Sequence, residues 1–135
     1  MTSETRQQLI QSIPWVFAAW TVAILALTLS PRESFAGQAP FAVAKIAHVV
    51  VFGGWTFLLG LYVTEYRRRQ RLPIVPLFLA GVTFGAVVEL GQFLLPFDRS
   101  GSLVDVAINA AGITGALLML KWMQYRRVRN DRHAS

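Results

Sequence analysis

The sequence contains no cysteine, and only seven of its 135 residues are acidic. The absence of cysteine excludes disulfides and thiolate metal sites. Charged residues make up 15% of the chain, whereas soluble domains carry about a quarter. Hydrophobic residues make up 54%. This composition supplies too little polar surface for a soluble fold of this length, and it indicates a single domain in a membrane.

Positive charge is the exception to this shortage of polar residues. The chain has 13 Lys and Arg residues and a formal net charge of +6. Such an excess also occurs in proteins that bind nucleic acids. Here the basic residues lie at the edges of apolar stretches, and no nucleic-acid recognition element is present. We therefore expect membrane lipids as partners and no nucleic acid.

Four apolar stretches reach the roughly 20 residues that a helix needs to cross a bilayer. They cover residues 13–30, 43–66, 73–95 and 102–125. Pro14 and Pro73 lie near the starts of their stretches, where the missing N–H of proline is tolerated. The sequence therefore predicts an all-α fold, a bundle of four transmembrane helices.

The distribution of basic residues predicts the orientation of the bundle. One side holds Arg6, the four arginines of residues 67–71 and the basic residues near the carboxyl end, whereas only Arg32, Lys45 and Arg99 fall on the other. Cytoplasmic loops carry the excess of Lys and Arg. We therefore expect both termini in the cytoplasm, with the connections at 31–42 and 96–101 outside.

This orientation divides the chain into three parts. Residues 1–12 form a cytoplasmic amino-terminal segment, residues 13–125 form the membrane domain, and residues 126–135 form a basic cytoplasmic tail. Glu65 is expected to pair with Arg68 or Arg69, which follow it at helical spacing.

Small residues indicate where helices approach closely in lipid. Gly81 and Gly85 form a G-x-x-x-G pair in the third stretch. Ala107, Ala111 and Gly115 form a stripe of small residues in the fourth. We expect both sets to lie against neighbouring helices.

Polar side chains occur in three of the four stretches, as one pair in each. The pairs are Lys45 with His48, Glu89 with Gln92, and Asp105 with Asn109. Members three or four residues apart share one face of a helix. Ionisable groups inside a span are costly and usually turn inward at functional sites.

The three pairs are expected to lie at one depth. His48, Glu89 and Asn109 each fall roughly 8–10 Å from the outer end of their span, at 1.5 Å per residue. Arg99, in the preceding connection, is expected to lie just above them. The sequence therefore predicts an outward-facing pocket that contains Lys45, His48, Glu89, Gln92, Arg99, Asp105 and Asn109.

The same residues carry a resemblance to a known family. The chain resembles the VanZ-like family of small bacterial membrane proteins, which is named for a teicoplanin-resistance determinant. The resemblance rests on Lys45-x-x-His48, Glu89-x-x-Gln92, Arg99, Asp105-x-x-x-Asn109 and Gly112-x-x-Gly115. It covers about residues 25–120. Ala44 departs from the pattern, because an acidic residue often precedes this lysine.

The resemblance implies a protein of the bacterial cytoplasmic membrane, linked in some members to glycopeptide resistance or envelope polymers. Our first hypothesis is a binding module, in which Lys45 and Arg99 contact the phosphate of an anionic or lipid-linked envelope precursor. Precursors of this kind include lipid-linked glycans and peptidoglycan precursors, and we expect them, with membrane lipids, as partners. A homo-oligomer or an envelope partner protein is also compatible with so small a bundle.

Two other classes of function stay open. The first is an intramembrane enzyme that acts on such a lipid, with His48 and Glu89 as acid and base and Asp105 beside them. The second is a structural subunit whose polar cluster only holds three helices together. A metal bound by His48, Glu89 and Asp105 is disfavoured, because Lys45 and Arg99 are nearby. We expect neither a metal nor another cofactor.

Overall fold

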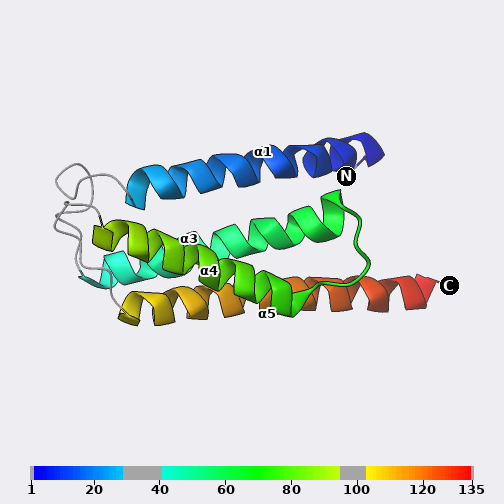
Figure 1. Cartoon of the computed structure of the whole chain (residues 1–135). Helices are drawn as coiled ribbons and strands as arrows, with labels where there is room; N and C mark the ends of the chain where they lie inside the picture. Colours follow the sequence, from blue (N-terminus) through cyan, green and yellow to red (C-terminus); the bar gives the residue numbers. More distant parts are fainter. Residues whose placement is uncertain (1, 29–40, 95–102, 135) are drawn as a thin grey trace.

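The computed structural model describes residues 2–28, 41–94 and 103–134. These residues form α1 (Ser3–Thr28), α3 (Phe41–Leu61), the π-helical turn η1 (Tyr62–Tyr66), α4 (Ile74–Leu94) and α5 (Leu103–Ala134). No strand occurs within these ranges. The four long helices lie side by side, and both chain ends lie at the same end of the molecule (Figure 1). The predicted all-α fold is confirmed.

Each of the four long helices is long and apolar enough to cross a membrane. The starts of the last two helices follow the predicted stretches closely, since α4 begins at Ile74 and α5 at Leu103. Hydropathy sets these limits because lipid tolerates only backbone whose polar groups are bonded within the helix. The chain is therefore a multi-pass membrane protein.

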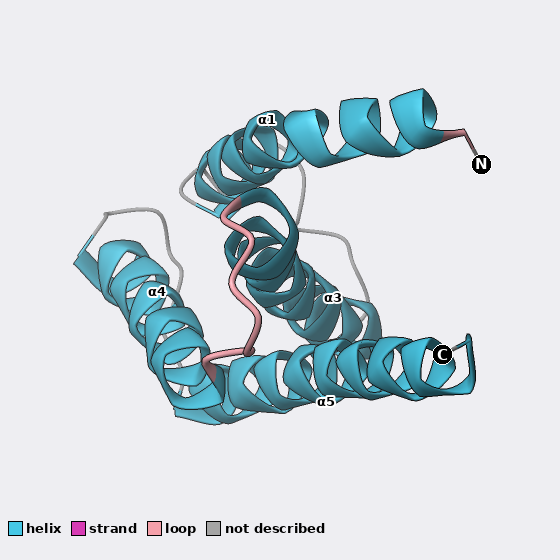
Figure 2. Cartoon of the chain, turned by 90° about the vertical axis from the view of Figure 1, so that its right-hand side faces the viewer, coloured by secondary structure: helices cyan, strands magenta, loops and turns pink. Residues whose placement is uncertain are grey.

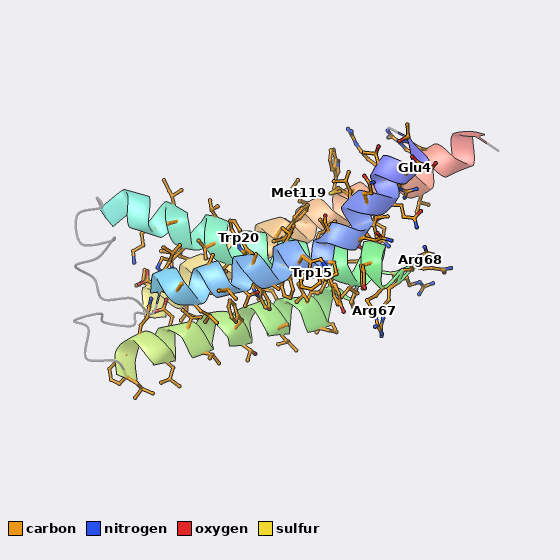
Figure 3. All side chains as sticks on the ribbon, turned by 90° about the horizontal axis from the view of Figure 1, so that it is seen from above. Glu4, Trp15, Trp20, Arg67, Arg68 and Met119 are labelled. Atoms are coloured by element: carbon orange, nitrogen blue, oxygen red, sulfur yellow. The ribbon has the colours of Figure 1, made fainter. Side chains whose placement is uncertain are left out.

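The first helix begins earlier than its apolar stretch, and the predicted place of Pro14 near a helix start is wrong. The helix begins at Ser3, so Pro14 lies in its interior. Proline offers no N–H to the carbonyl one turn before it, and such positions bend a helix. Figure 3 shows that the part of α1 near Glu4 departs from the line of the part that carries Trp20.

The last helix continues past the apolar stretch. It extends to Ala134, through most of the residues predicted to form a basic tail. Arginine, which is frequent there, has a favourable helix propensity. The basic residues from Arg126 onward therefore lie on a helical extension of α5.

Helix α3 occupies the centre of the bundle and packs most extensively on α5. The end-on view in Figure 2 shows α1, α4 and α5 arranged around it. The α3–α5 contact is close because Gly53 faces Gly112, where a Cβ on Gly53 would lie 2.9 Å from the Gly112 carbonyl oxygen. The predicted stripe on α5 is wrong as a packing face, since Ala107, Ala111 and Gly115 are exposed.

A hydrophobic core fills the space between α3, α4 and α5. It includes Phe52, Leu77, Val88, Ile113, Leu117 and Leu120. Gly81 and Gly85 are buried on α4, as the G-x-x-x-G pair predicted. This core separates the polar residues at one end of the bundle from the basic residues at the other.

Helix α1 attaches to this core by hydrogen bonds more than by burial, since Ile24 is its one buried residue. The indole N–H of Trp55 on α3 donates to Thr21 Oγ1 at 3.0 Å. In return, the indole N–H of Trp20 donates to the Val51 carbonyl at 3.2 Å. The two bonds fix the helical register of α1 against α3.

Candidate functional site

Polar side chains from three helices meet at the end of the bundle opposite the chain termini. Lys45 and His48 come from α3, Glu89 from α4, and Asp105 and Asn109 from α5. We call these five residues the polar cluster. Each pair on one helix is spaced three or four residues apart, so both of its members turn to the same face. The three helices thus bring together five of the seven predicted site residues.

Lys45 and Asp105 form an ion pair between α3 and α5. Their side chains are 21% and 15% exposed, so both lie near the edge of the cluster. A partly buried pair of this kind is stable only because each charge neutralises the other.

His48 lies between Asn109 and Glu89. Its Nδ1 is 3.1 Å from Asn109 Oδ1 and 3.7 Å from Glu89 Oε1. An amide oxygen only accepts hydrogen bonds, so Nδ1 carries the proton in the bond to Asn109. The Glu89 side chain is 7% exposed and that of His48 is 23% exposed. Burial therefore increases from the ion pair and His48 toward Glu89.

Gln92 binds a partner that the sequence patterns did not indicate. Its Nε2 donates to the Thr28 main-chain carbonyl at 3.0 Å. The last carbonyls of a helix have no partner within the helix, and Thr28 is the last residue of α1. Gln92 therefore joins α1 to the same end of the bundle. The sequence did show that Gln92 lies near the outer end of its own stretch. Spacing along one helix, however, cannot predict which residue of a distant helix it contacts.

Two further observations complete the site. Thr56, eight residues after His48 on α3, is fully buried and packs beside Gly81. No sequence pattern marked this threonine, because it occurs within an apolar stretch. Arg99, the seventh predicted residue, lies outside the described residues.

The side chains of His48, Glu89 and Asp105 offer ligand atoms that lie within 4.8 Å of one another. A cation would have to displace Lys45 from Asp105. The donor set is suitable for a metal, but its lysine neighbour makes the arrangement a poor cation site.

Basic residues occupy the opposite end of the bundle, where the predicted partners of Glu65 are wrong. Glu65 forms an ion pair with Arg127 of α5 instead of Arg68 or Arg69. The π-helical turn ends at Tyr66, and Arg68 has φ of 53°, so regular helical spacing does not continue from Glu65. An interruption of this kind is not visible in hydropathy.

The fold and the polar cluster define a small α-helical membrane protein with ionisable side chains inside its spans. The family model VanZ/LLP1 matches residues 2–124, and the chain belongs to this family. Comparison with curated proteins and with solved structures gives no match. The family membership agrees with the resemblance in the sequence motifs, and the match spans α1, α3, α4 and α5 as far as residue 124.

Proposed function

We propose that the polar cluster binds the headgroup of an anionic or lipid-linked envelope precursor. The observation that carries this proposal is the Lys45–Asp105 ion pair at the partly exposed edge of the cluster. A phosphate that approaches from this end can replace Asp105 as the partner of the Lys45 ammonium, because both are anionic oxygen acceptors. Asp105 is then free to accept hydrogen bonds from sugar hydroxyls or peptide N–H groups.

The remaining residues of the cluster support selectivity in this proposal. His48 and Asn109 are hydrogen-bonded to each other, so each is held in a fixed orientation. Fixed polar groups bind a ligand with less loss of conformational entropy. Arg99 is proposed as a second phosphate contact on the basis of its position in the sequence.

The proposal includes a location. We place the protein in the bacterial cytoplasmic membrane, with both termini in the cytoplasm and the polar cluster near the outer surface. Because the chain has no cysteine, single substitutions can report the side directly. In intact cells, an impermeant maleimide should label Ser100→Cys and should not label Ser3→Cys or Gln70→Cys. The opposite pattern would reverse the orientation.

Lipid binding is tested by native mass spectrometry of the purified protein with its co-purified lipids, for the wild type and Glu89→Gln. Binding of purified anionic lipids and lipid-linked glycans is then titrated with Lys45→Ala and Arg99→Ala. Lys121→Ala removes the same charge from an exposed site on α5 and serves as the control. Unchanged binding in both Lys45→Ala and Arg99→Ala would refute the proposal. If the protein supports glycopeptide resistance, the same variants should reduce it.

An intramembrane enzyme is the second candidate, and the 3.7 Å separation of His48 Nδ1 and Glu89 Oε1 favours it. A carboxylate beside an imidazole can orient it for proton transfer to a bound substrate. Turnover of a lipid-linked substrate that survives both His48→Ala and Glu89→Gln would exclude this assignment. A purely structural role predicts instead that Glu89→Gln lowers thermal stability in detergent without a separate effect on ligand binding.

A further inference from the structure

A cavity of about 450 Å³ lies at the end of the bundle that holds the chain termini. Residues from α1, η1, the α3–α4 connection and α5 form its walls. Figure 3 shows Arg67 and Arg68 at this end, which is also the end that carries Glu4. Cavities of about 300–1,000 Å³ are typical of sites for small molecules. We call it the basic cavity.

The charge of the basic cavity is strongly positive. Its walls contain Arg6, Arg68, Arg69 and Arg127, and Glu65 is the one acidic residue among the described lining. Four positive charges and one negative give a formal charge of +3. Guanidinium groups bind phosphate through paired N–H donors with matching geometry.

The backbone brings two consecutive arginines to one cavity. In an α-helix, neighbouring side chains point about 100° apart, at 3.6 residues per turn. Here the N–H of Arg69 bonds to the Val63 carbonyl at 3.2 Å, and Arg68 adopts the left-handed conformation with φ of 53°. A bulky residue rarely adopts this conformation. As a result, Arg68 and Arg69 both line the cavity.

The floor of the basic cavity is apolar. Leu61, Leu72 and Leu120 line it, and Leu120 is 4% exposed and belongs to the hydrophobic core. The cavity therefore combines a charged rim with an apolar floor, and it lies at the end of the apolar spans. Free phosphate would use only the rim, whereas a phospholipid would contact both surfaces.

We propose that the basic cavity binds the phosphate headgroup of an anionic phospholipid from the adjacent leaflet. Basic pockets between membrane helices are sites for such headgroups. The shared chemistry with soluble phosphate is the arginine rim, and the apolar floor favours the lipid. This site contains no residue of the polar cluster, so it stands independently of the function proposed above.

The test uses the full chain in detergent and native mass spectrometry with phosphatidylglycerol, phosphatidylcholine or inorganic phosphate. The wild type should retain phosphatidylglycerol in preference to phosphatidylcholine. Arg6→Gln should weaken retention about fivefold, because each basic residue near an anionic lipid contributes about 1 kcal/mol. Arg6→Gln with Arg69→Gln should weaken it about 30-fold, because two such contributions are lost. Arg127 is left in place because it is paired with Glu65.

The matched control is Arg126→Gln with Arg129→Gln, which removes two charges from exposed positions of α5 that do not line the cavity. This control should retain the wild-type preference. Equal loss in both double variants would overturn the proposal, because it would mean diffuse electrostatic attraction. Retention of inorganic phosphate that phosphatidylglycerol does not displace would also overturn it, in favour of a soluble ligand. Helical content of every variant, measured by circular dichroism, establishes that each one is folded.

Discussion

Gly112 on α5 lies directly against the backbone of Val49 on α3. A Cβ on Gly112 would be closer to the Val49 carbonyl oxygen than any side-chain contact allows, so the two helices can meet here only without a side chain. Gly112→Ala should therefore force α3 and α5 apart, at a cost of about 1–3 kcal/mol, as for other overpacked sites. Thermal unfolding in detergent measures the change.

Gly115, one turn along α5, provides the control for this substitution. A Cβ there would meet no atom within 4 Å. Gly115→Ala should be neutral or should stabilise the helix by up to about 1 kcal/mol, because alanine is the better helix former. Similar destabilisation by both substitutions would contradict the close approach of α3 to Gly112.

The Lys45–Asp105 ion pair predicts a non-additive pair of substitutions. Asp105→Asn should destabilise the protein by about 1–3 kcal/mol, between the values for exposed and buried pairs, because it leaves the lysine charge without this carboxylate. Lys45→Met combined with Asp105→Asn should recover part of the loss, because the lysine charge that lost this carboxylate is then removed as well. A double-mutant cycle of unfolding measurements with a coupling energy near zero would mean that the pair does not form in solution.

The bond between Trp55 and Thr21 predicts how firmly α1 is held. Thr21→Val removes the acceptor of the indole N–H and should cost about 1 kcal/mol, as for a typical hydrogen bond. Because α1 buries so little, limited proteolysis should cut the variant near α1 sooner than the wild type.

Thr114→Val is the matched control for Thr21, since the Thr114 hydroxyl is exposed and bonds to the Ala110 carbonyl of its own helix. Its proteolysis should follow the wild type. Faster cutting of both variants would show that the hydroxyls act through their own helices and not through α3.

Glu65 predicts a gain of binding at the basic cavity. Glu65→Gln raises the formal charge of the cavity lining from +3 to +4 and releases Arg127 from its carboxylate partner. Retention of phosphatidylglycerol should increase by up to about fivefold. Glu4→Gln adds the same charge at the same end of the molecule but outside the lining, and it should have little effect. A decrease with Glu65→Gln would mean that the ion pair shapes the cavity.

Sequence predicts the limits of a helix well where the bilayer fixes them and poorly where the helix extends beyond lipid. Hydropathy located α4 and α5 to within one residue of their observed starts, since the bilayer imposes a length and an apolar composition. It did not locate the start of α1 or the end of α5, because polar helix outside lipid has no such signature. Pro14 was placed near a helix start for the same reason.

The candidate site divides in a similar way. Lys45, His48, Glu89, Asp105 and Asn109 were identified because charged and amide side chains stand out in apolar sequence, and helical spacing gave their faces. Thr28 acts through its main-chain carbonyl, which every residue has, so no residue type could mark it. The partner of Glu65 depended on a π-helical turn and a left-handed arginine. Local spacing could not anticipate either feature.

The order of helices around α3 also has a consequence for biosynthesis. Lys45 is made 60 residues before Asp105, its ion-pair partner, and His48 is made 61 residues before Asn109. The first three long helices therefore leave the ribosome before α5 supplies the partners of Lys45 and His48. Such ionisable side chains are costly in lipid. The nascent chain must remain in a protein-lined or hydrated setting, such as the translocation channel, until its final helix arrives to complete the bundle.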